Sequence, residues 1–141
     1  PMSCIFCRIV DAQDNAAVIY DDESVMAFLD IKPFFLWYSL VISKKYFPDF
    51  NLMPPGDMEH FFSVLQKTAL AVQKGCGAKG LNIVSNIGKA AGQSVFHCHF
   101  HLIPRYGSDH FRMKAVTRSY RSAEEKADIL CRIRNCIQCE D

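Results

Sequence analysis

The sequence lacks several features that would place it in a specialised class of protein. No stretch approaches the ~18 consecutive apolar residues of a membrane-spanning helix. The 16 basic and 15 acidic residues nearly balance, and no basic run exceeds Lys44-Lys45, which argues against a dedicated nucleic-acid-binding protein. The N-terminus shows no basic segment followed by an apolar core. We therefore expect no signal peptide, and we expect Pro1 ahead of Met2 to be a cloning remnant.

An even set of cysteines is also missing. Seven cysteines cannot form a complete disulfide framework, so the sequence favours reduced thiols and a cytoplasmic protein. Two pairs have C-x-x-C spacing, Cys4/Cys7 and Cys136/Cys139. The first pair could hold a metal, act as a redox pair or pack as two small hydrophobic side chains. No histidine lies near the second pair in the sequence, so a metal site is less favoured there.

The chain has the composition of an ordinary globular protein. Half of its 141 residues are hydrophobic, which predicts one domain over residues 1–141. Apolar periodicity predicts helices at 4–10, 58–74 and 122–137, and strands at 17–20, 25–31, 38–42, 81–87 and 94–103. Asp57 and Gly75 are expected to cap the long helix. This order predicts an α+β fold, in which an antiparallel sheet of about five strands has a central helix and a C-terminal helix covering one face.

The predicted strand at 94–103 carries the most informative pattern. His97, His99 and His101 alternate with apolar residues, and Pro104 is expected to end the run. Because alternate side chains of a strand share a face, the three imidazoles would lie on one side of the sheet. They could bind a metal, provide a nucleophilic imidazole or be surface residues without a chemical role. Strict alternation on an otherwise apolar strand disfavours the last explanation.

The loop before this strand separates the remaining two explanations. Residues 86–94 contain glycines, which let backbone N–H groups approach a phosphate closely. Asn86, Gln93 and Ser94 add neutral hydrogen-bonding groups. A metal site has no need of such a loop, whereas a phosphate beside an imidazole does. The sequence therefore favours nucleophilic catalysis over a pure metal site.

The block Asn86-x-Gly88-x-x-Ala91-Gly92-Gln93-Ser94-Val95-x-His97-x-His99-x-His101 resembles the signature of the histidine triad (HIT) superfamily of nucleotide hydrolases and transferases. Residues 4–10, 28–33 and 40–45 resemble other blocks of that family in the same order and spacing, and 102–106 is similar to its bacterial members, close to the Hint branch. The resemblance covers essentially the whole chain. It implies a HIT fold, a homodimer and a purine nucleotide ligand.

The resemblance also implies a reaction and its residues. His99 matches the family nucleophile, which would attack the α-phosphate of a nucleoside phosphoramidate or dinucleoside polyphosphate and form a nucleotidyl-histidine that water hydrolyses. His101 matches the group that contacts the phosphate and leaving group, and His97 the one that fixes the geometry. The remaining matches are phosphate-binding Asn86, Gly92, Gln93 and Ser94, ribose-binding Asp30, and a base pocket of Ile5, Phe6, Ile9, Phe28 and Ile31.

Trp37-Tyr38 departs from the family pattern, because many members have Gly-His at this point. A phenol with a pKa of ~10 cannot titrate near neutrality as an imidazole does. This difference leaves a second hypothesis, a nucleotide-binding or interaction protein with little turnover.

A second departure concerns metal binding. Zinc-containing relatives use the equivalents of Cys4, Cys7 and His97 together with a histidine where this chain has Tyr46. Structural zinc takes four nitrogen or sulfur ligands, so the sequence offers one too few. We therefore expect no required cofactor, and zinc, if bound, would be structural. A zinc-binding structural domain is a third hypothesis, which the glycine loop and Asp30 disfavour.

Overall fold

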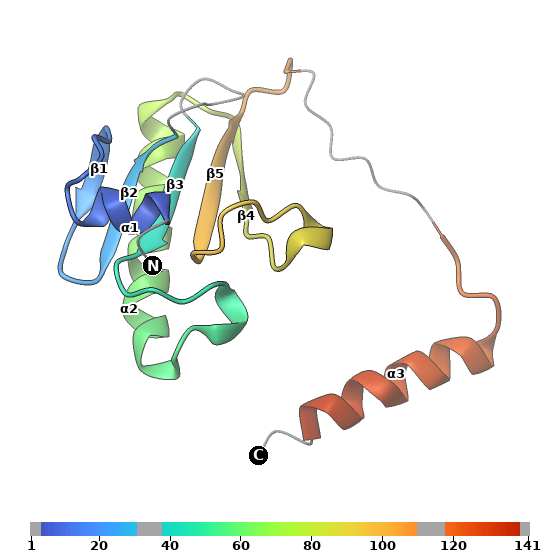
Figure 1. Cartoon of the computed structure of the whole chain (residues 1–141). Coiled ribbons are helices and arrows are strands. Elements are labelled where there is room, and N and C mark those ends of the chain that lie inside the picture. The colour runs from blue at the N-terminus through green and yellow to red at the C-terminus, as the bar shows by residue number, and fades with distance from the viewer. Residues whose placement is uncertain (1–3, 31–37, 110–117, 139–141) are drawn as a thin grey trace. The chain divides into compact units, whose positions relative to one another are not determined.

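The computed structural model describes residues 4–30, 38–109 and 118–138 (Figure 1). Its elements are α1 (Ile5–Val10), β1 (Val18–Asp21), β2 (Val25–Leu29), β3 (Ser39–Ser43), η1 (Phe50–Leu52), α2 (Pro55–Gly75), β4 (Gly80–Val84), η2 (Lys89–Ala91), β5 (His99–Arg105) and α3 (Ala123–Gln138). The chain divides into two compact units, residues 1–109 and 110–141. The single domain over 1–141 stays a prediction.

The five strands form one antiparallel sheet in the order β1-β2-β3-β5-β4. The predicted α+β class and strand number are thereby confirmed. β5 begins at His99, later than predicted, because its pairing with β3 starts at the Ile42–His99 pair. It also continues through Pro104, which was expected to end it. The pairing with β3 stops at Leu102, so the missing N–H of Pro104 breaks no bond to that strand.

Helices cover both faces of the sheet, and the prediction of one covered face is wrong. Along β2, Val25 and Ala27 belong to the core against α2, while Met26 and Phe28 belong to the core against α1. Figure 1 shows α1 and α2 on opposite sides of the strands. Burial on both faces explains why this strand reads as a continuous apolar run rather than an alternating one.

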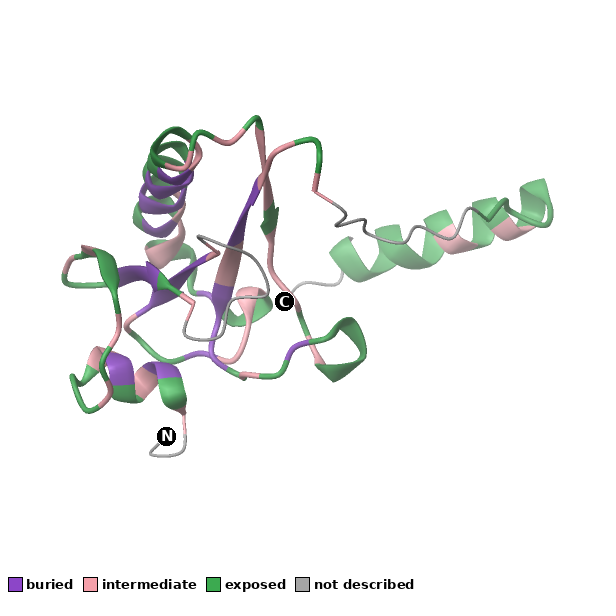
Figure 2. Cartoon of the chain, turned by 90° about the horizontal axis from the view of Figure 1, so that it is seen from above, coloured by how far each residue is buried: buried purple, intermediate pink, exposed green. Residues whose placement is uncertain are grey.

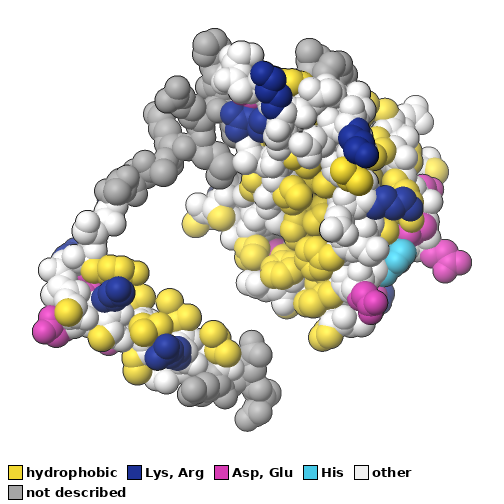
Figure 3. Space-filling view, turned by 180° about the vertical axis from the view of Figure 1, so that it is seen from behind, with side chains coloured by type: hydrophobic (Ala, Val, Ile, Leu, Met, Phe, Trp, Pro, Cys, Tyr) yellow, Lys and Arg dark blue, Asp and Glu magenta, His cyan; other side chains and the backbone are white. Residues whose placement is uncertain are grey.

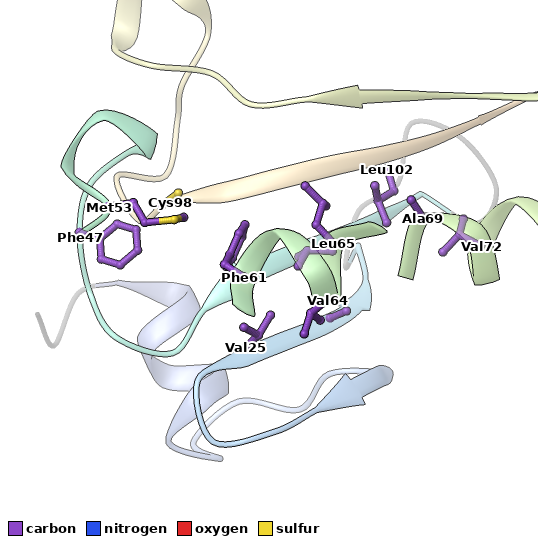
Figure 4. Packing of buried hydrophobic residues seen from close by; sticks show 12 residues of the cluster. Val25, Phe47, Met53, Phe61, Val64, Leu65, Ala69, Val72, Cys98 and Leu102 are labelled. Carbon is purple, nitrogen blue, oxygen red and sulfur yellow. The ribbon is translucent and has the colours of Figure 1, made fainter. Parts of the chain in front are cut away.

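The core against α2 is the larger of the two. Phe61, Val64, Leu65 and Val72 turn toward the sheet at helical spacing (Figure 4). Burying each such side chain contributes about 1.5–3 kcal/mol. Figure 2 shows the buried residues concentrated in the central strands and on one side of α2.

The ends of α2 differ slightly from the predicted caps. The helix begins at Pro55, whose missing N–H would be unpaired there in any case, so Asp57 lies in the first turn. Cys76 is the C-cap, and the positive φ of 62° that turns the chain away belongs to Gly77 instead of Gly75.

The second unit contains α3. Its N-terminus is capped by a side chain, because the Glu125 N–H donates to the Ser122 hydroxyl oxygen over 3.0 Å. Leu130, Ile133 and Ile137 follow at helical spacing and are exposed. Hydrophobic side chains line this helix in Figure 3. Within the described residues, no helix combines the length and apolar character needed to cross a bilayer.

Candidate active site

His99 stands at the start of β5 on the face covered by α1. Its Nδ1 lies 2.6 Å from the backbone carbonyl oxygen of His97. A carbonyl can only accept, so Nδ1 carries the proton and Nε2 carries the lone pair. Burial lowers the pKa of His99 below its ordinary value. The ring is therefore a neutral imidazole with a free nucleophilic nitrogen at pH 7.

His101 lies two residues further along the same face. Its ring centroid is 4.8 Å from that of His99. Nδ1 is hydrogen-bonded to the Tyr38 hydroxyl, while Nε2 is buried and has no hydrogen-bond partner among the described residues. Burial and the neighbouring His99 lower the pKa of His101 to about 4, so this ring is also neutral at pH 7.

The two rings line a cavity of about 280 Å³ together with residues from four other segments. Its lining is Ile5, Phe6, Asp30, Leu40, Ser94, Val95, His99 and His101. The structure thus gathers six predicted site residues from distant parts of the chain. Leu40 and Val95 were not predicted as lining residues, although Leu40 pairs with His101 across the sheet and Val95 belongs to the histidine-containing block.

Two predicted base-pocket residues do not line this cavity. Ile9 and Phe28 are buried in the core beneath α1, where the Phe28 ring contacts that of Phe6 at a centroid distance of 5.8 Å. They support the wall that Phe6 forms, and their contact with a base stays a prediction. Ile31 and Trp37 lie outside the described residues.

The glycine-containing loop has positive φ angles at two of its glycines. Gly88 and Gly92 have φ angles of 85° and 92°, which residues with a side chain rarely adopt. A Cβ on Gly92 would lie 3.8 Å from Nδ2 of Asn86, so these two predicted phosphate-side residues are neighbours. Ser94 is exposed and lines the cavity.

Gln93 has a different role from the predicted phosphate contact. Its side-chain Nε2 donates to the carbonyl oxygens of Pro48 and Val95 over 2.7 and 3.0 Å. Its Oε1 accepts from the Gly88 N–H over 2.8 Å. Both amide hydrogens are used, and the residue is only 3% exposed. Gln93 therefore holds the loop in shape and has no side-chain donor left for a phosphate.

His97 is directed away from the cavity, toward the thiols of Cys4 and Cys7. Its Nε2 lies 2.6 Å from the Ser43 carbonyl oxygen and so carries the proton. The lone pair on Nδ1 faces both sulfur atoms, at 3.3 and 3.4 Å. His97 thus reaches the site through its backbone carbonyl, which holds His99. The Phe6 ring of α1 contacts the rings of both His97 and His99, so His97 lies on the predicted side of the sheet, although it precedes β5.

This group of three side chains fits a metal ion. The three donor atoms lie within 4.8 Å of one another. Tetrahedral zinc, with bonds of about 2.3 Å to sulfur and about 2.0 Å to nitrogen, separates those ligands by about 3.6 Å. Two thiols and an unprotonated imidazole nitrogen are the ligands that zinc prefers. Tyr46 packs edge-on against His97 at a centroid distance of 5.5 Å.

Comparison with known proteins gives a consistent result. The family model described as HIT domain matches residues 11–108. An uncharacterized HIT-like protein of Methanocaldococcus jannaschii is 46% identical over 106 residues, covering 75% of this chain and 81% of the relative. An adenylylsulfatase of Arabidopsis thaliana is 33% identical over 106 residues, covering 75% of this chain and 54% of the relative.

Solved structures show the same similarity. A HIT family member from Bacillus subtilis superposes with a TM-score of 0.84 at 36% identity, covering 94% of this chain and 96% of that one. A zinc-bound histidine triad family protein from Mycobacterium smegmatis gives a TM-score of 0.73 at 36% identity, covering 96% and 98% of the two chains.

Proposed function

Because the chain belongs to the HIT domain family, we propose that it is a hydrolase that cleaves purine nucleotide conjugates at the α-phosphate. The observation that carries the proposal is the unprotonated Nε2 of buried His99 beside a cavity of about 280 Å³. This volume lies near the lower end of the ~300–1,000 Å³ typical of ligand pockets, which suits one mononucleotide unit. The substrates are nucleoside phosphoramidates or dinucleoside polyphosphates.

The reaction proceeds in two displacements. Nε2 of His99 attacks the α-phosphorus, and the bond to the leaving group breaks as the nitrogen–phosphorus bond forms. The imidazole gains positive charge in this step, and the His97 carbonyl oxygen on Nδ1–H stabilises it. Water then attacks the phosphorus, releases the mononucleotide and returns the electron pair to Nε2. His101 contacts the phosphate and the leaving group.

Other residues bind the nucleotide around this centre. The Asp30 carboxylate accepts hydrogen bonds from the ribose hydroxyls, since a charged acceptor strengthens such bonds. Ile5 and Phe6 form the apolar wall against the base. Ser94 binds the phosphate directly, while Asn86, Gly92 and Gln93 shape the loop that holds it.

The decisive experiment is substitution of the nucleophile. We expect His99→Ala to lose turnover of adenosine 5′-phosphoramidate and diadenosine polyphosphate while retaining most of its affinity for AMP. Adenosine 5′-phosphosulfate is a third test substrate, because one relative is an adenylylsulfatase. Mass spectrometry of the wild-type protein after acid-free quenching should show a nucleotidyl adduct on His99. Equal rates for variant and wild type would exclude the covalent mechanism.

A nucleotide-binding protein with little turnover is the second candidate function. Tyr38 favours it, because a hydroxyl stands beside His101 where many relatives have an imidazole. Tight AMP binding by the wild-type protein, without an adduct or turnover, would establish this alternative.

The cluster of two cysteines and one histidine has a structural role in the proposal. Cys4, Cys7 and His97 would hold zinc, which would tie the start of α1 to the segment before β5. The ion would supply cross-linking and take no part in the reaction. We further propose a homodimer acting in the cytoplasm, which agrees with the free cysteines among the described residues.

A further inference from the structure

Tyr38 connects the segment before β3 to the second imidazole of the cavity. Its hydroxyl is hydrogen-bonded to Nδ1 of His101, and the two rings meet edge-to-face at a centroid distance of 5.4 Å. The adjacent Leu40–His101 strand pair holds the two segments in register. A neutral imidazole has one N–H and one lone pair. The direction of the Tyr38 bond therefore decides which nitrogen of His101 carries the proton.

The chemistry of both partners assigns the donor. An imidazole lone pair is a stronger acceptor than a phenol oxygen. Burial and the charge of Asp30 raise the pKa of Tyr38 to about 12, so its hydroxyl keeps its hydrogen. With Tyr38 donating, the lone pair of His101 is on Nδ1 and its proton is on Nε2.

The opposite nitrogen of His101 is prepared for a ligand. Nε2 is buried and has no partner among the described residues, while the ring lines the cavity. A buried N–H without an acceptor is costly, and bound oxygen relieves that cost. His99 has the reverse arrangement, with its proton on Nδ1 and its lone pair on Nε2. The two neighbouring rings therefore offer one nucleophile and one donor.

We propose that Tyr38 is a positioning residue that holds His101 as the Nε2–H tautomer, ready to donate to a phosphate oxygen or leaving-group atom beside the lone pair of His99. The identity of that ligand rests on the proposed function. Tyr38 itself does not touch the nucleotide. In this chain Tyr38 orients His101 where many family members have a histidine. Unlike that histidine, Tyr38 does not titrate near neutrality.

The test compares Tyr38→Phe, which removes only the hydroxyl, with Tyr20→Phe as a matched control. Tyr20 lies on β1, away from the cavity, and its hydroxyl donates to the Asp22 carboxylate over 2.7 Å. Tyr20→Phe therefore also removes one hydroxyl hydrogen bond. The first readout is ¹⁵N NMR of the histidine side chains, which distinguishes the two tautomers. AMP affinity and steady-state kinetics with adenosine 5′-phosphoramidate are the second and third.

We expect wild-type His101 to be protonated at Nε2 and Tyr38→Phe to show a mixture of tautomers. AMP affinity should fall roughly three- to tenfold, as for one lost hydrogen bond. The value of kcat should fall roughly tenfold or more, because the donor is no longer held in place. Tyr20→Phe should match the wild type in all three readouts.

Protonation of wild-type His101 at Nδ1 would overturn the proposal. So would a Tyr38→Phe variant that keeps both the tautomer and the AMP affinity. If Tyr38→Phe does not fold, the wild-type NMR spectrum decides alone. A wild-type protein that shows the predicted tautomer and binds AMP, but turns over no substrate, would refute the proposed function and leave the role of Tyr38 intact.

Discussion

At the scale of single residues, the cavity depends on imidazoles that stay neutral. His101 has a pKa of about 4 in the folded protein, lowered by burial and by His99, against about 6.5 in an unfolded chain. Between these values the unfolded state binds more protons than the folded state. The contribution of neutral His101 to the free energy of unfolding is therefore complete above about pH 6.5, and it decreases as the pH falls toward 4.

We expect this single group to cost on the order of 3 kcal/mol of unfolding free energy between neutral pH and pH 4. Urea denaturation at a series of pH values measures it. In His101→Gln the dependence should become correspondingly shallower, because glutamine does not titrate. Parallel pH profiles for the variant and the wild type would show that His101 is not the group responsible.

The cluster of Cys4, Cys7 and His97 supports a second prediction at this scale. Zinc added to the reduced protein should raise its melting temperature, since a ligand that binds the folded state stabilises it. Cys4→Ser should remove most of that increase because it removes one of three donors. Cys76→Ser is the control, since Cys76 lies outside the group. An equal increase in Cys4→Ser and wild type would exclude this site.

At the scale of elements, the loop before β5 depends on its backbone conformation. Gly88 has φ 85° and ψ 158°, a region that is essentially restricted to glycine. An added Cβ would meet nothing within 4 Å, so substitution there tests backbone strain alone. The backbone of Gly88 is also held in place, because its N–H donates to the side chain of the buried Gln93.

Gly88→Ala should therefore destabilise the protein by about 1–3 kcal/mol and weaken AMP binding. Gly56→Ala is the matched control, since its site is equally open but lies in the first turn of α2, where alanine is favoured by about 0.5–1 kcal/mol. Thermal denaturation and AMP titration of both variants measure the difference. Similar stability of the two variants would contradict the strain argument.

At the scale of the whole molecule, β4 is the last strand of the described sheet, and one of its side chains, Ile83, is 49% exposed. Within the part of the chain that the structure describes, no strand pairs with its outer edge, and such an edge can pair with another strand. Phe62, Leu65, Ala69 and Ile83 line a shallow cavity next to it, and Figure 3 shows hydrophobic side chains gathered on the first unit. In the homodimer that we propose, a second copy of the chain would cover this surface.

We expect sedimentation to give twice the chain mass of 16.0 kDa. Ile83→Glu should shift the protein toward the monomer, because it places a charge in the apolar contact. Ile19→Glu is the control, since Ile19 is 42% exposed on β1 at the opposite edge of the sheet. A monomer at all concentrations in the wild-type protein would refute the dimer.

The sequence by itself determined the elements of this protein and pointed to the chemistry that we propose for it. Apolar periodicity located the three α-helices and the five strands to within about five residues at each end, because burial repeats with the period of the element, whereas the short helices η1 and η2 were not predicted. The alternating histidines and the glycine-containing loop indicated imidazole chemistry on a phosphate, since both signals are local. The prediction that Pro104 ends the last strand was wrong, because pairing with neighbouring strands, and not local propensity, set the end of β5.

Only the tertiary structure decided what each side chain faces. The sequence placed Ile9 and Phe28 in a pocket wall that they support from behind, and Gln93 on a phosphate although its amide binds the loop. The partners of His97, His99 and His101 come from a helix cap, a backbone carbonyl and a tyrosine in another segment. Proton positions follow from those partners, and no spacing along the chain reveals them.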